Sequence, residues 1–360
     1  MAGPRNDDLI MKILIFTKNW LGDVLFEVPA MKALRDNFPE AHIVALAPER
    51  CLEILNAVPY LNEVRAFDER GSERSPFAKI RFIQWLRSEK FDKVFLFHRS
   101  FTRALLAWLG NIPERIGYET PKRKRILTKA VPKPRQAMHQ VDYFLVLLKW
   151  AGLNVQFGSE YQFFCTESGN KIAQEFLKTG ELQEKRFVAF HIGANWGPKR
   201  WPATHFAELA RRLSRHFFCS IVLTGSRKDI PIAEKIVREA TQARVISLCG
   251  KTTIEALGAV FQKAAFVVSS DSGPLHIASG VGTSAVALFG PTCPLLTGPR
   301  GVGKKIVLQY VPPGYSIPWK GNKLPEGGWM EKITPEEVFK KIIQEKLWEV
   351  QKEKIFSSSH

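Results

Sequence analysis

The chain has 360 residues, of which 45% are hydrophobic and 24% charged, a composition that suggests two soluble domains rather than one. Its longest apolar stretch, residues 141–153, is interrupted by Asp142 and Lys149 and is too short to span a bilayer. Residues 1–8 lack the basic and apolar regions of a signal peptide, so we expect a cytoplasmic protein that can still contact the cytoplasmic face of the inner membrane.

The formal net charge is +17, and the excess is uneven. Residues 70–135 carry 17 basic and 5 acidic side chains, a net charge of +12. Such a concentration favours an anionic partner: nucleic acid, anionic lipid or an acidic substrate. A protein that is simply basic overall remains the alternative.

The first half of the chain alternates between strand and helix patterns, which indicates a parallel sheet. A buried first strand (KILIFTK) is followed by a short loop and a helix, and the pattern then repeats. In chain order, we predict strands at 12–18, 42–48, 63–67, 93–98 and 115–118, with helices at 24–37, 49–57, 77–89, 101–109 and 136–151.

The second half repeats this alternation from about Thr166. Its first strand (FVAFHIG) precedes a helix that begins with Pro202, and proline is favoured in the first turn of a helix. In chain order, we predict strands at 187–193, 220–225, 245–249, 265–270 and 284–289, with helices at 202–216, 230–240, 253–263, 272–279 and 334–350. In sheets of this kind ligands bind beyond the carboxyl ends of the strands, so the chemistry should lie in the loops that follow them.

The loop at residues 269–276 (SSDSGPLH) joins a predicted strand to a helix. Ser272 is a good N-cap, Gly273 allows close approach of a ligand to the backbone, and Pro274 is tolerated in the first turn. The helix N-terminus would bind a diphosphate. A plain capped helix is an equally good interpretation of the spacing alone.

A second loop, residues 191–202 (HIGANWGPKRWP), also joins a strand to a helix. Lys199 could neutralise a phosphate on a departing nucleotide. The alternative is that Lys199 and Arg200 are solvated, while Trp201 is expected to pack in the core.

The third loop is residues 19–23 (NWLGD), after the first strand. Asp23 lies at or near a helix N-terminus, where its carboxylate could accept a proton from a substrate hydroxyl. An N-capping role is the common alternative.

Metal chemistry is not indicated, because there is no Asp-x-Asp motif and no Cys/His cluster with zinc spacing. Lys199 and the helix terminus would then neutralise the diphosphate. The cysteines are widely spaced and are expected to be buried, reduced thiols: Cys51, Cys165, Cys219, Cys249 and Cys293.

At these loops the sequence resembles the ADP-heptose:lipopolysaccharide heptosyltransferase family. The segments occur in the family's order, span nearly the whole chain and are specific together rather than singly. They are KILI (12–15), LGD (21–23), PA (29–30), WGPKRWP (196–202), DSGPLH (271–276) and LFGPT (288–292). Residues 197–202 and 100–118 are similar to the heptosyltransferase II branch.

The resemblance implies a GT-B fold of α/β class, with two Rossmann-like doubly wound domains facing a central cleft. Residues 1–165 would bind the acceptor, 166–333 the nucleotide sugar, and the helix at 334–360 would pack back on the N-terminal domain. The implied reaction transfers heptose from ADP-heptose, a substrate rather than a cofactor, to the lipid-linked inner core of lipopolysaccharide. It inverts the anomeric carbon and requires no metal.

The resemblance also implies roles for single residues. Asp23 resembles the general base, Lys199 the residue that steadies the leaving diphosphate, and Asp271 the donor-sugar contact. The donor site would further include Ser272, Gly273, His276, Asn195, Arg200, Thr224 and Gly225. The acceptor, with its anionic groups, would be bound by Trp20, Gly22, Arg99, Arg103, Arg115 and Arg123. The basic run at residues 122–125, which includes Arg123, could instead be a solvated loop. Some relatives carry donor-loop threonines where this chain has Ala194 and Asn195.

Three alternatives remain open at this point. A related GT-B transferase could use another nucleotide sugar or glycan acceptor. A non-catalytic protein could bind nucleic acid or an anionic surface through its charge, although no interleaved aromatic and basic RNA-recognition motif is present, so no nucleic acid is expected. A nucleotide-sugar epimerase of the same architecture would turn over the donor without an acceptor.

Overall fold

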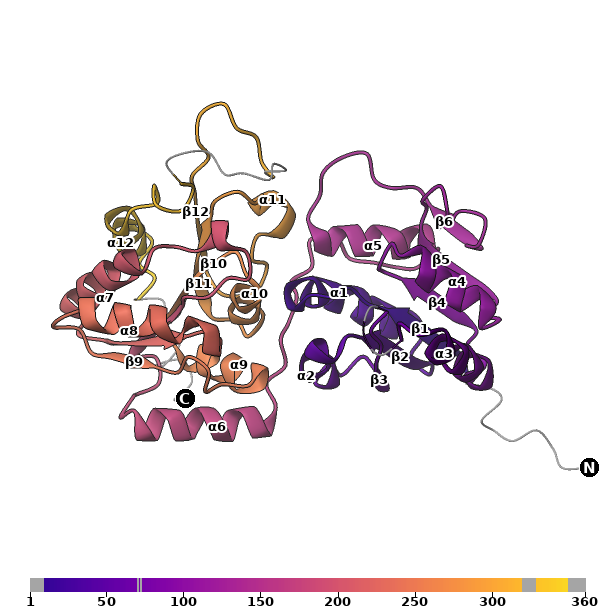
Figure 1. The fold of residues 1–360 in the computed structure, drawn as a ribbon, viewed down its shortest axis with the longest axis horizontal. Helices are drawn as coiled ribbons and strands as arrows, with labels where there is room; N and C mark the ends of the chain where they lie inside the picture. Colours follow the sequence, from indigo (N-terminus) through magenta and orange to yellow (C-terminus); the bar gives the residue numbers. More distant parts are fainter. Residues whose placement is uncertain (1–9, 70, 72, 319–327, 349–360) are drawn as a thin grey trace, which may run out of the picture. The chain divides into compact units, whose positions relative to one another are not determined.

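The computed structural model describes residues 10–69, 71, 73–318 and 328–348. The chain forms two compact units, divided between Tyr161 and Gln162, whereas the predicted boundary lay between 165 and 166 (Figure 1). Within the described residues each unit contains one sheet of six strands, and all the strand pairs are parallel. The predicted α/β class with two doubly wound units is therefore confirmed.

The first unit follows the predicted alternation, with a short edge strand that the sequence pattern did not indicate, β6. Its elements are β1 (Lys12–Phe16), α1 (Leu21–Asn37), β2 (His42–Ala47), the 3-10 helix η2 (Glu49–Cys51), α2 (Leu52–Asn56), β3 (Glu63–Ala66), α3 (Pro76–Glu89), β4 (Lys93–Leu96), α4 (Phe101–Leu109), β5 (Glu114–Tyr118), β6 (Lys129–Val131) and α5 (Gln140–Trp150). The strand order is β3-β2-β1-β4-β5-β6.

Helices α3 and α4 cover one face of this sheet, because their buried residues join the same core as alternate residues of the strands. Phe82 of α3 packs with Phe16 of β1 and with Phe67, which lies edge-on to Phe16 at 5.3 Å. Phe97, at the end of β4, instead packs on Phe144 of α5. Helices α5 and α1, which pack together, therefore cover the opposite face.

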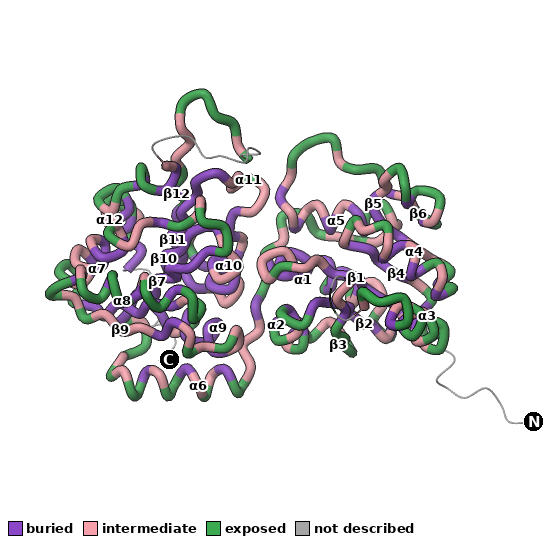
Figure 2. The backbone as a smooth tube through the Cα atoms, in the orientation of Figure 1, coloured by how far each residue is buried: buried purple, intermediate pink, exposed green. Residues whose placement is uncertain are grey.

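The second unit is built in the same way. Its elements are α6 (Glu167–Thr179), β7 (Phe187–His191), the 3-10 helix η3 (Gly197–Lys199), α7 (Ala203–Phe217), β8 (Ser220–Thr224), the 3-10 helix η4 (Arg227–Asp229), α8 (Ile230–Glu239), β9 (Val245–Ser247), α9 (Ile254–Lys263), β10 (Phe266–Ser270), α10 (Gly273–Gly280), β11 (Ser284–Phe289), α11 (Pro294–Thr297), β12 (Lys305–Gln309) and α12 (Pro335–Gln344). The strand order is β12-β11-β10-β7-β8-β9, and the four central strands, β11, β10, β7 and β8, are buried along almost their whole length (Figure 2).

The terminal helix α12 belongs to the second unit. It packs against α7 and β12, and its buried Val338 and Ile342 belong to the core of the second unit. The apolar stripe of α12 is thus buried by the core of its own unit. That residues 334–360 pack back on the first unit stays a prediction. The predicted continuation of the helix to 350 reaches beyond the described residues.

The strand order shows where the chain changes direction across each sheet. In the first unit, successive strands run from β1 to β2 and β3 on one side and from β4 to β5 and β6 on the other, so the switch point lies between β1 and β4. In the second unit the corresponding switch point lies between β7 and β10. Ligands of doubly wound sheets bind at the carboxyl ends of the strands at such a switch point. The loops that follow these four strands are therefore where each unit should bind its ligand. No helix of the described residues is long and apolar enough to cross a membrane.

Candidate active site

The loop after β1 is held in place by a buried arginine. Arg103 of α4 is 2% exposed, and its guanidinium donates to the Thr17 carbonyl and, at 2.7 Å, to the Asn19 side chain. Glu69 accepts a further bond from the Arg103 Nε. From the other side, the Arg50 Nε donates to the Asn19 carbonyl at 2.8 Å. The loop is thus fixed in front of the first turn of α1.

Asp23 lies in that first turn and is half-buried. It does not cap the helix: the N-cap is Trp20, which is 56% exposed and lies under the Arg50 guanidinium. Gly22 is also half-buried. The structure therefore places Trp20, Gly22 and Asp23 together at the carboxyl edge of the first sheet, as predicted.

Glu27, one turn after Asp23, is a residue that the sequence did not single out. It is fully buried; one carboxyl oxygen accepts from the Lys18 N–H at 2.8 Å, and the other has no hydrogen-bond partner among the described residues. Burial raises the pKa of Glu27 well above its ordinary value, and the nearby Asp23 adds to this. Nothing in the sequence distinguishes Glu27 from an exposed helical glutamate.

The four arginines predicted to bind the acceptor differ in exposure and in position. Arg99, in the loop after β4, is exposed and hydrogen-bonds the Tyr143 side chain. Arg115 lies instead at the start of β5, where it donates to carbonyls at the opposite edge of the sheet. Arg103 and Arg123 are buried.

These positions correct three predictions of acceptor contact. The donors of Arg103 are used inside the protein, and Arg115 lies at the wrong edge. Arg123 is fully buried beside Gly117, donates to the His98 carbonyl at 2.8 Å, and has its pKa lowered to about 10 by burial. Charge in a sequence gives no measure of burial, so only Arg99 of the predicted arginines stays an acceptor candidate.

In the second unit, the loops after β7 and β10 meet through a salt bridge. The Lys199 Nζ, in η3, lies 2.7 Å from the Asp271 carboxylate. His276 of α10 approaches the second Asp271 oxygen at 3.7 Å. Asp271 is 5% exposed, yet its pKa falls to about 2: burial alone would raise it, but the hydrogen bond from His276 and the charge of Lys199 outweigh that effect. The structure thus brings Lys199, predicted to be catalytic, together with Asp271 and His276, predicted to bind the donor.

Ser272 is the N-cap residue of α10, and Gly273 is the first residue of that helix. The Ser272 hydroxyl makes no capping bond within the described chain; it lies 3.3 Å from the Ser269 hydroxyl. An N-terminus without a side-chain cap, beside Lys199, is suited to an anionic ligand.

Asp229, another residue that the sequence analysis missed, organises the neighbouring loops. Its carboxylate is 4% exposed and accepts from the backbone and hydroxyl of Ser226 at 2.8 and 2.7 Å. A Cβ on Gly193 would lie 2.6 Å from this carboxylate, so glycine is required there. The signal was available: Ser226-x-x-Asp229 is a capping box directly after a strand.

Of the remaining predicted donor residues, Arg200 and Gly225 lie beside Asp229. The Arg200 Nε donates to the Ala194 carbonyl at 2.9 Å, and its guanidinium lies 3.9 Å from Asp229. Asn195 is exposed and Gly225 half-buried. The Thr224 side chain is fully buried and bonds His191 at 3.2 Å, so the prediction that it contacts the donor is corrected: the hydroxyl points into the core.

The other sequence predictions for this unit concern packing. Trp201 is 2% exposed and donates to the Ile333 carbonyl at 2.8 Å, which confirms that it packs in the core. All five cysteines are free thiols; Cys51, Cys219 and Cys249 are buried, as predicted, whereas Cys165 and Cys293 are half-buried. No group of three or more His, Cys, Asp or Glu side chains in the described part of the chain could hold a metal ion.

Comparison with known proteins establishes the family of the chain. The model of glycosyltransferase family 9 (heptosyltransferase) matches residues 79–314, more than half of the chain. The chain belongs to glycosyltransferase family 9. It is therefore a glycosyltransferase, and the predicted family is confirmed.

The relatives of this family 9 chain cover nearly its whole length. Lipopolysaccharide heptosyltransferase 2 of Salmonella typhimurium is 27% identical over 82% of this chain and 88% of its own. The crystal structure of a family 9 glycosyl transferase from Veillonella parvula aligns with a TM-score of 0.80 at 25% identity, over 94% of this chain and 97% of its own. The E. coli ADP-heptose lipopolysaccharide heptosyltransferase II structure aligns with a TM-score of 0.75 at 24% identity, over 95% and 100%. These likenesses support the GT-B fold.

Proposed function

We propose that this chain transfers heptose from ADP-heptose to the inner core of lipopolysaccharide, with inversion at the anomeric carbon. The observation that carries the proposal is the cluster of Lys199, Asp271 and His276 at the N-terminus of α10. The relatives named as heptosyltransferases support the choice of donor and acceptor.

In the proposed reaction, the second unit holds the donor. Lys199 and the N-terminus of α10 bind the diphosphate and stabilise the negative charge that grows on it as the sugar departs. Asp271 keeps Lys199 in place and contacts the sugar. Because its pKa is about 2, Asp271 is ionised throughout the neutral range.

The first unit holds the acceptor. Asp23 takes the proton of the acceptor hydroxyl as its oxygen attacks the anomeric carbon from the side opposite ADP. Arg99, exposed in the loop after β4, binds the acceptor's carboxylate or phosphate groups. Since the acceptor is lipid-linked, the enzyme works at the cytoplasmic face of the inner membrane. No metal or cofactor takes part.

The test is transfer from ADP-heptose to a heptose-Kdo lipid A acceptor by wild type, Asp23→Ala and Lys199→Ala. We expect each substitution to lower the turnover number by about 10²–10³-fold, the usual effect of removing a general base or a charge-stabilising group. Far-ultraviolet circular dichroism checks that both variants fold. A near-normal rate in either variant would remove that residue from the mechanism, and transfer from another nucleotide sugar in preference to ADP-heptose would replace the proposed donor.

A further inference from the structure

Large apolar side chains lie exposed on α3 and α4, the two helices that cover one face of the first sheet. Phe77 and Ile80 of α3 are 79% and 52% exposed, and Trp108 of α4 is 52% exposed. One face of α4 carries three apolar residues at helical spacing: Phe101, which is exposed, Leu105, which is half-buried, and Trp108. We call this set the α3–α4 apolar patch.

The core of the unit does not account for this patch. Helix α3 already buries Ala78, Phe82 and Leu86 on its inner side, at a spacing of four residues. In α4 the charged residue, Arg103, is buried, while the outer face carries Phe101 and Trp108. Helix α4 also buries Ala104, Leu106 and Ala107, so apolar groups lie on both of its faces while its one charged residue lies inside. This indicates that its outer face contacts something other than water.

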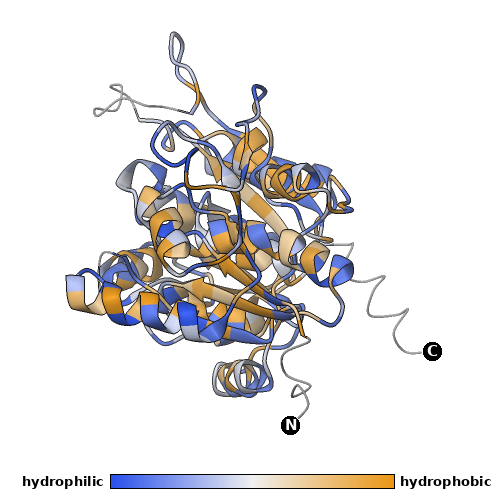
Figure 3. Cartoon of the chain, turned by 90° about the vertical axis from the view of Figure 1, so that its right-hand side faces the viewer, coloured by the Kyte–Doolittle hydropathy of each residue, from blue (hydrophilic) through white to orange (hydrophobic). Residues whose placement is uncertain are grey.

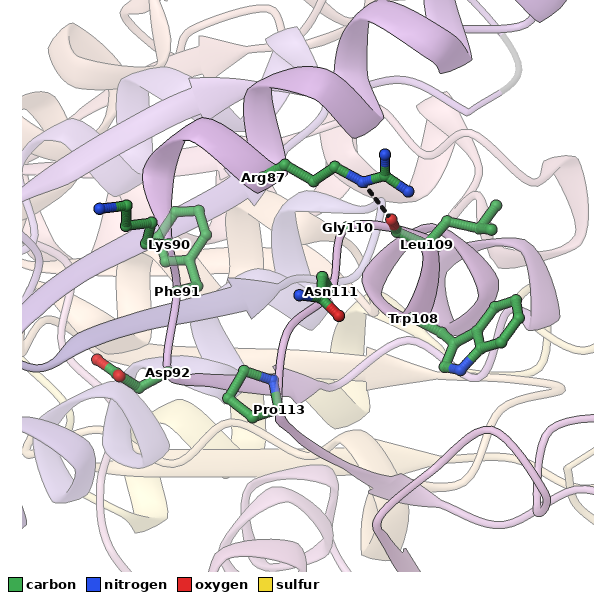
Figure 4. A pocket seen from close by; sticks show the side chains of 9 residues that line it. All are labelled: Arg87, Lys90, Phe91, Asp92, Trp108, Leu109, Gly110, Asn111 and Pro113. Atoms are coloured by element: carbon green, nitrogen blue, oxygen red, sulfur yellow. Dashed lines mark hydrogen bonds between the residues drawn. The ribbon is translucent and has the colours of Figure 1, made fainter.

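Basic side chains border the patch. Arg81 and Arg87 are exposed on α3, on the same outer side as Phe77 and Ile80, and Lys90 follows the helix. Arg87 and Lys90 line a hollow of about 760 Å³ together with Trp108 (Figure 4). The Arg87 Nε donates to the Leu109 carbonyl at 2.9 Å, and its other two nitrogens point away from that carbonyl.

The two acidic residues close to this border are already engaged. Glu89 accepts from the Lys12 Nζ at 3.1 Å, and Asp92, which lines the hollow, accepts from the Lys12 backbone N–H at 2.7 Å. Arg81, Arg87 and Lys90, together with Lys12, outnumber Glu89 and Asp92, so the border carries net positive charge. The side of the first unit that bears α3 and α4 faces the viewer in Figure 3, where hydrophobic and hydrophilic stretches lie next to each other along the helices.

We propose that the α3–α4 apolar patch is the surface by which this enzyme lies on a bilayer containing anionic phospholipid. Exposed Phe, Ile and Trp side chains enter the boundary between headgroups and acyl chains, while Arg81, Arg87 and Lys90 pair with lipid phosphates. The proposal deepens the proposed function, on which its biological role rests, by naming the membrane contact of an enzyme with a lipid-linked acceptor.

The topology supports this assignment. Helices α3 and α4 follow β3 and β4, so both begin at the carboxyl edge of the sheet, where the loop of Arg99 and the first turn of α1 lie. Phe77 and Phe101 stand at those helix starts. A bilayer on this surface would present a lipid-linked sugar to the edge that carries Asp23.

The test measures sedimentation of the full chain with vesicles, in the absence of donor and acceptor. The vesicles contain phosphatidylglycerol and phosphatidylcholine, or phosphatidylcholine alone. We expect binding to the anionic vesicles that weakens with added salt, and a decrease of about tenfold or more in the triple variant Phe77→Ser, Ile80→Ser, Trp108→Ser. The matched control, Trp150→Ser with Phe218→Ser, alters residues that are 62% and 94% exposed elsewhere and should bind as wild type does.

Equal vesicle binding by the triple variant and wild type would overturn the proposal, as would the absence of wild-type binding. Sedimentation velocity tests a second occupant: a wild-type dimer that becomes monomeric in the triple variant would assign the patch to self-association instead.

Transfer to a deacylated, water-soluble acceptor separates this proposal from the proposed function. We expect the triple variant to keep the wild-type rate there, whereas a wild type without transfer activity would defeat the proposed function and leave the vesicle result standing.

Discussion

Each unit buries a carboxylate beside its crevice, and the two are held in opposite ways. In the second unit, Asp271 is 5% exposed and has two partners, Lys199 and His276. In the first unit, Glu27 is fully buried and has only the Lys18 N–H for one of its oxygens. The pKa of Asp271 is lowered to about 2, whereas that of Glu27 is raised well above its ordinary value.

The difference shows that hydrogen-bonding and charged partners decide which way the pKa of a buried carboxylate moves. Burial raises the pKa of both groups. For Asp271 the hydrogen bond from His276 and the charge of Lys199 outweigh this effect, whereas for Glu27 the Lys18 N–H and the charges of Lys18 and Arg103 do not. The result fits the proposed roles. An ionised Asp271 holds Lys199 for a diphosphate, and the raised pKa of Glu27 disfavours a second negative charge beside Asp23.

Asp271→Asn should have the larger effect on stability. The folded pKa of about 2 lies below the unfolded value of about 4, so the ionised carboxylate stabilises the protein above about pH 4, and this contribution is lost as the pH falls through about 2. Near neutral pH we expect the variant to lower the free energy of unfolding by about 2 kcal/mol, measured by urea denaturation. Asp36→Asn, in an exposed pair with Lys32, is the control and should change it by less than about 0.5 kcal/mol. An unchanged stability in Asp271→Asn would show that the salt bridge does not hold the carboxylate ionised.

Glu27→Gln should have a smaller effect of opposite sign. Because the folded pKa is raised, ionisation of Glu27 costs stability as the pH rises above the unfolded value of about 4. The amide removes this cost, so we expect a free energy of unfolding on the order of 1 kcal/mol higher near neutral pH and no gain near pH 4. Thermal melting across this range measures the difference. A variant less stable than wild type at neutral pH would mean that Glu27 is ionised and paired.

Much of the fold could be predicted because its signals are local. The buried strands, and helices such as α4, follow from apolar runs and periodicity. The position of Asp23 close to a helix start and the N-cap position of Ser272 follow from strand-to-helix loops, although α1 begins at Leu21 rather than at the predicted residue 24. The pairing of Lys199 with Asp271 could not be predicted, since it joins loops after two strands that only the sheet order makes neighbours.

The burial of particular polar side chains could not be predicted from the sequence. Arg103 and Arg123 looked like surface cations, but one fixes the loop after β1 and the other fills the space beside Gly117. Thr224 ends strand β8 with its hydroxyl buried. Helix α12 buries its apolar residues, Val338 and Ile342, in the core of the second unit. In each case the local pattern fits both an exposed and a buried side chain, and long-range packing decides between them.

The central claim, that the second unit binds the donor diphosphate through Lys199, is tested most directly by calorimetric titration of ADP. The titration compares wild type, Lys199→Met and the control Lys171→Met, which removes an exposed lysine of the same unit. A charged hydrogen bond to phosphate contributes about 1.5–3 kcal/mol, so we expect Lys199→Met to raise the dissociation constant of ADP by about 10- to 100-fold and Lys171→Met to leave it unchanged. Equal ADP affinity in wild type and Lys199→Met would contradict the account.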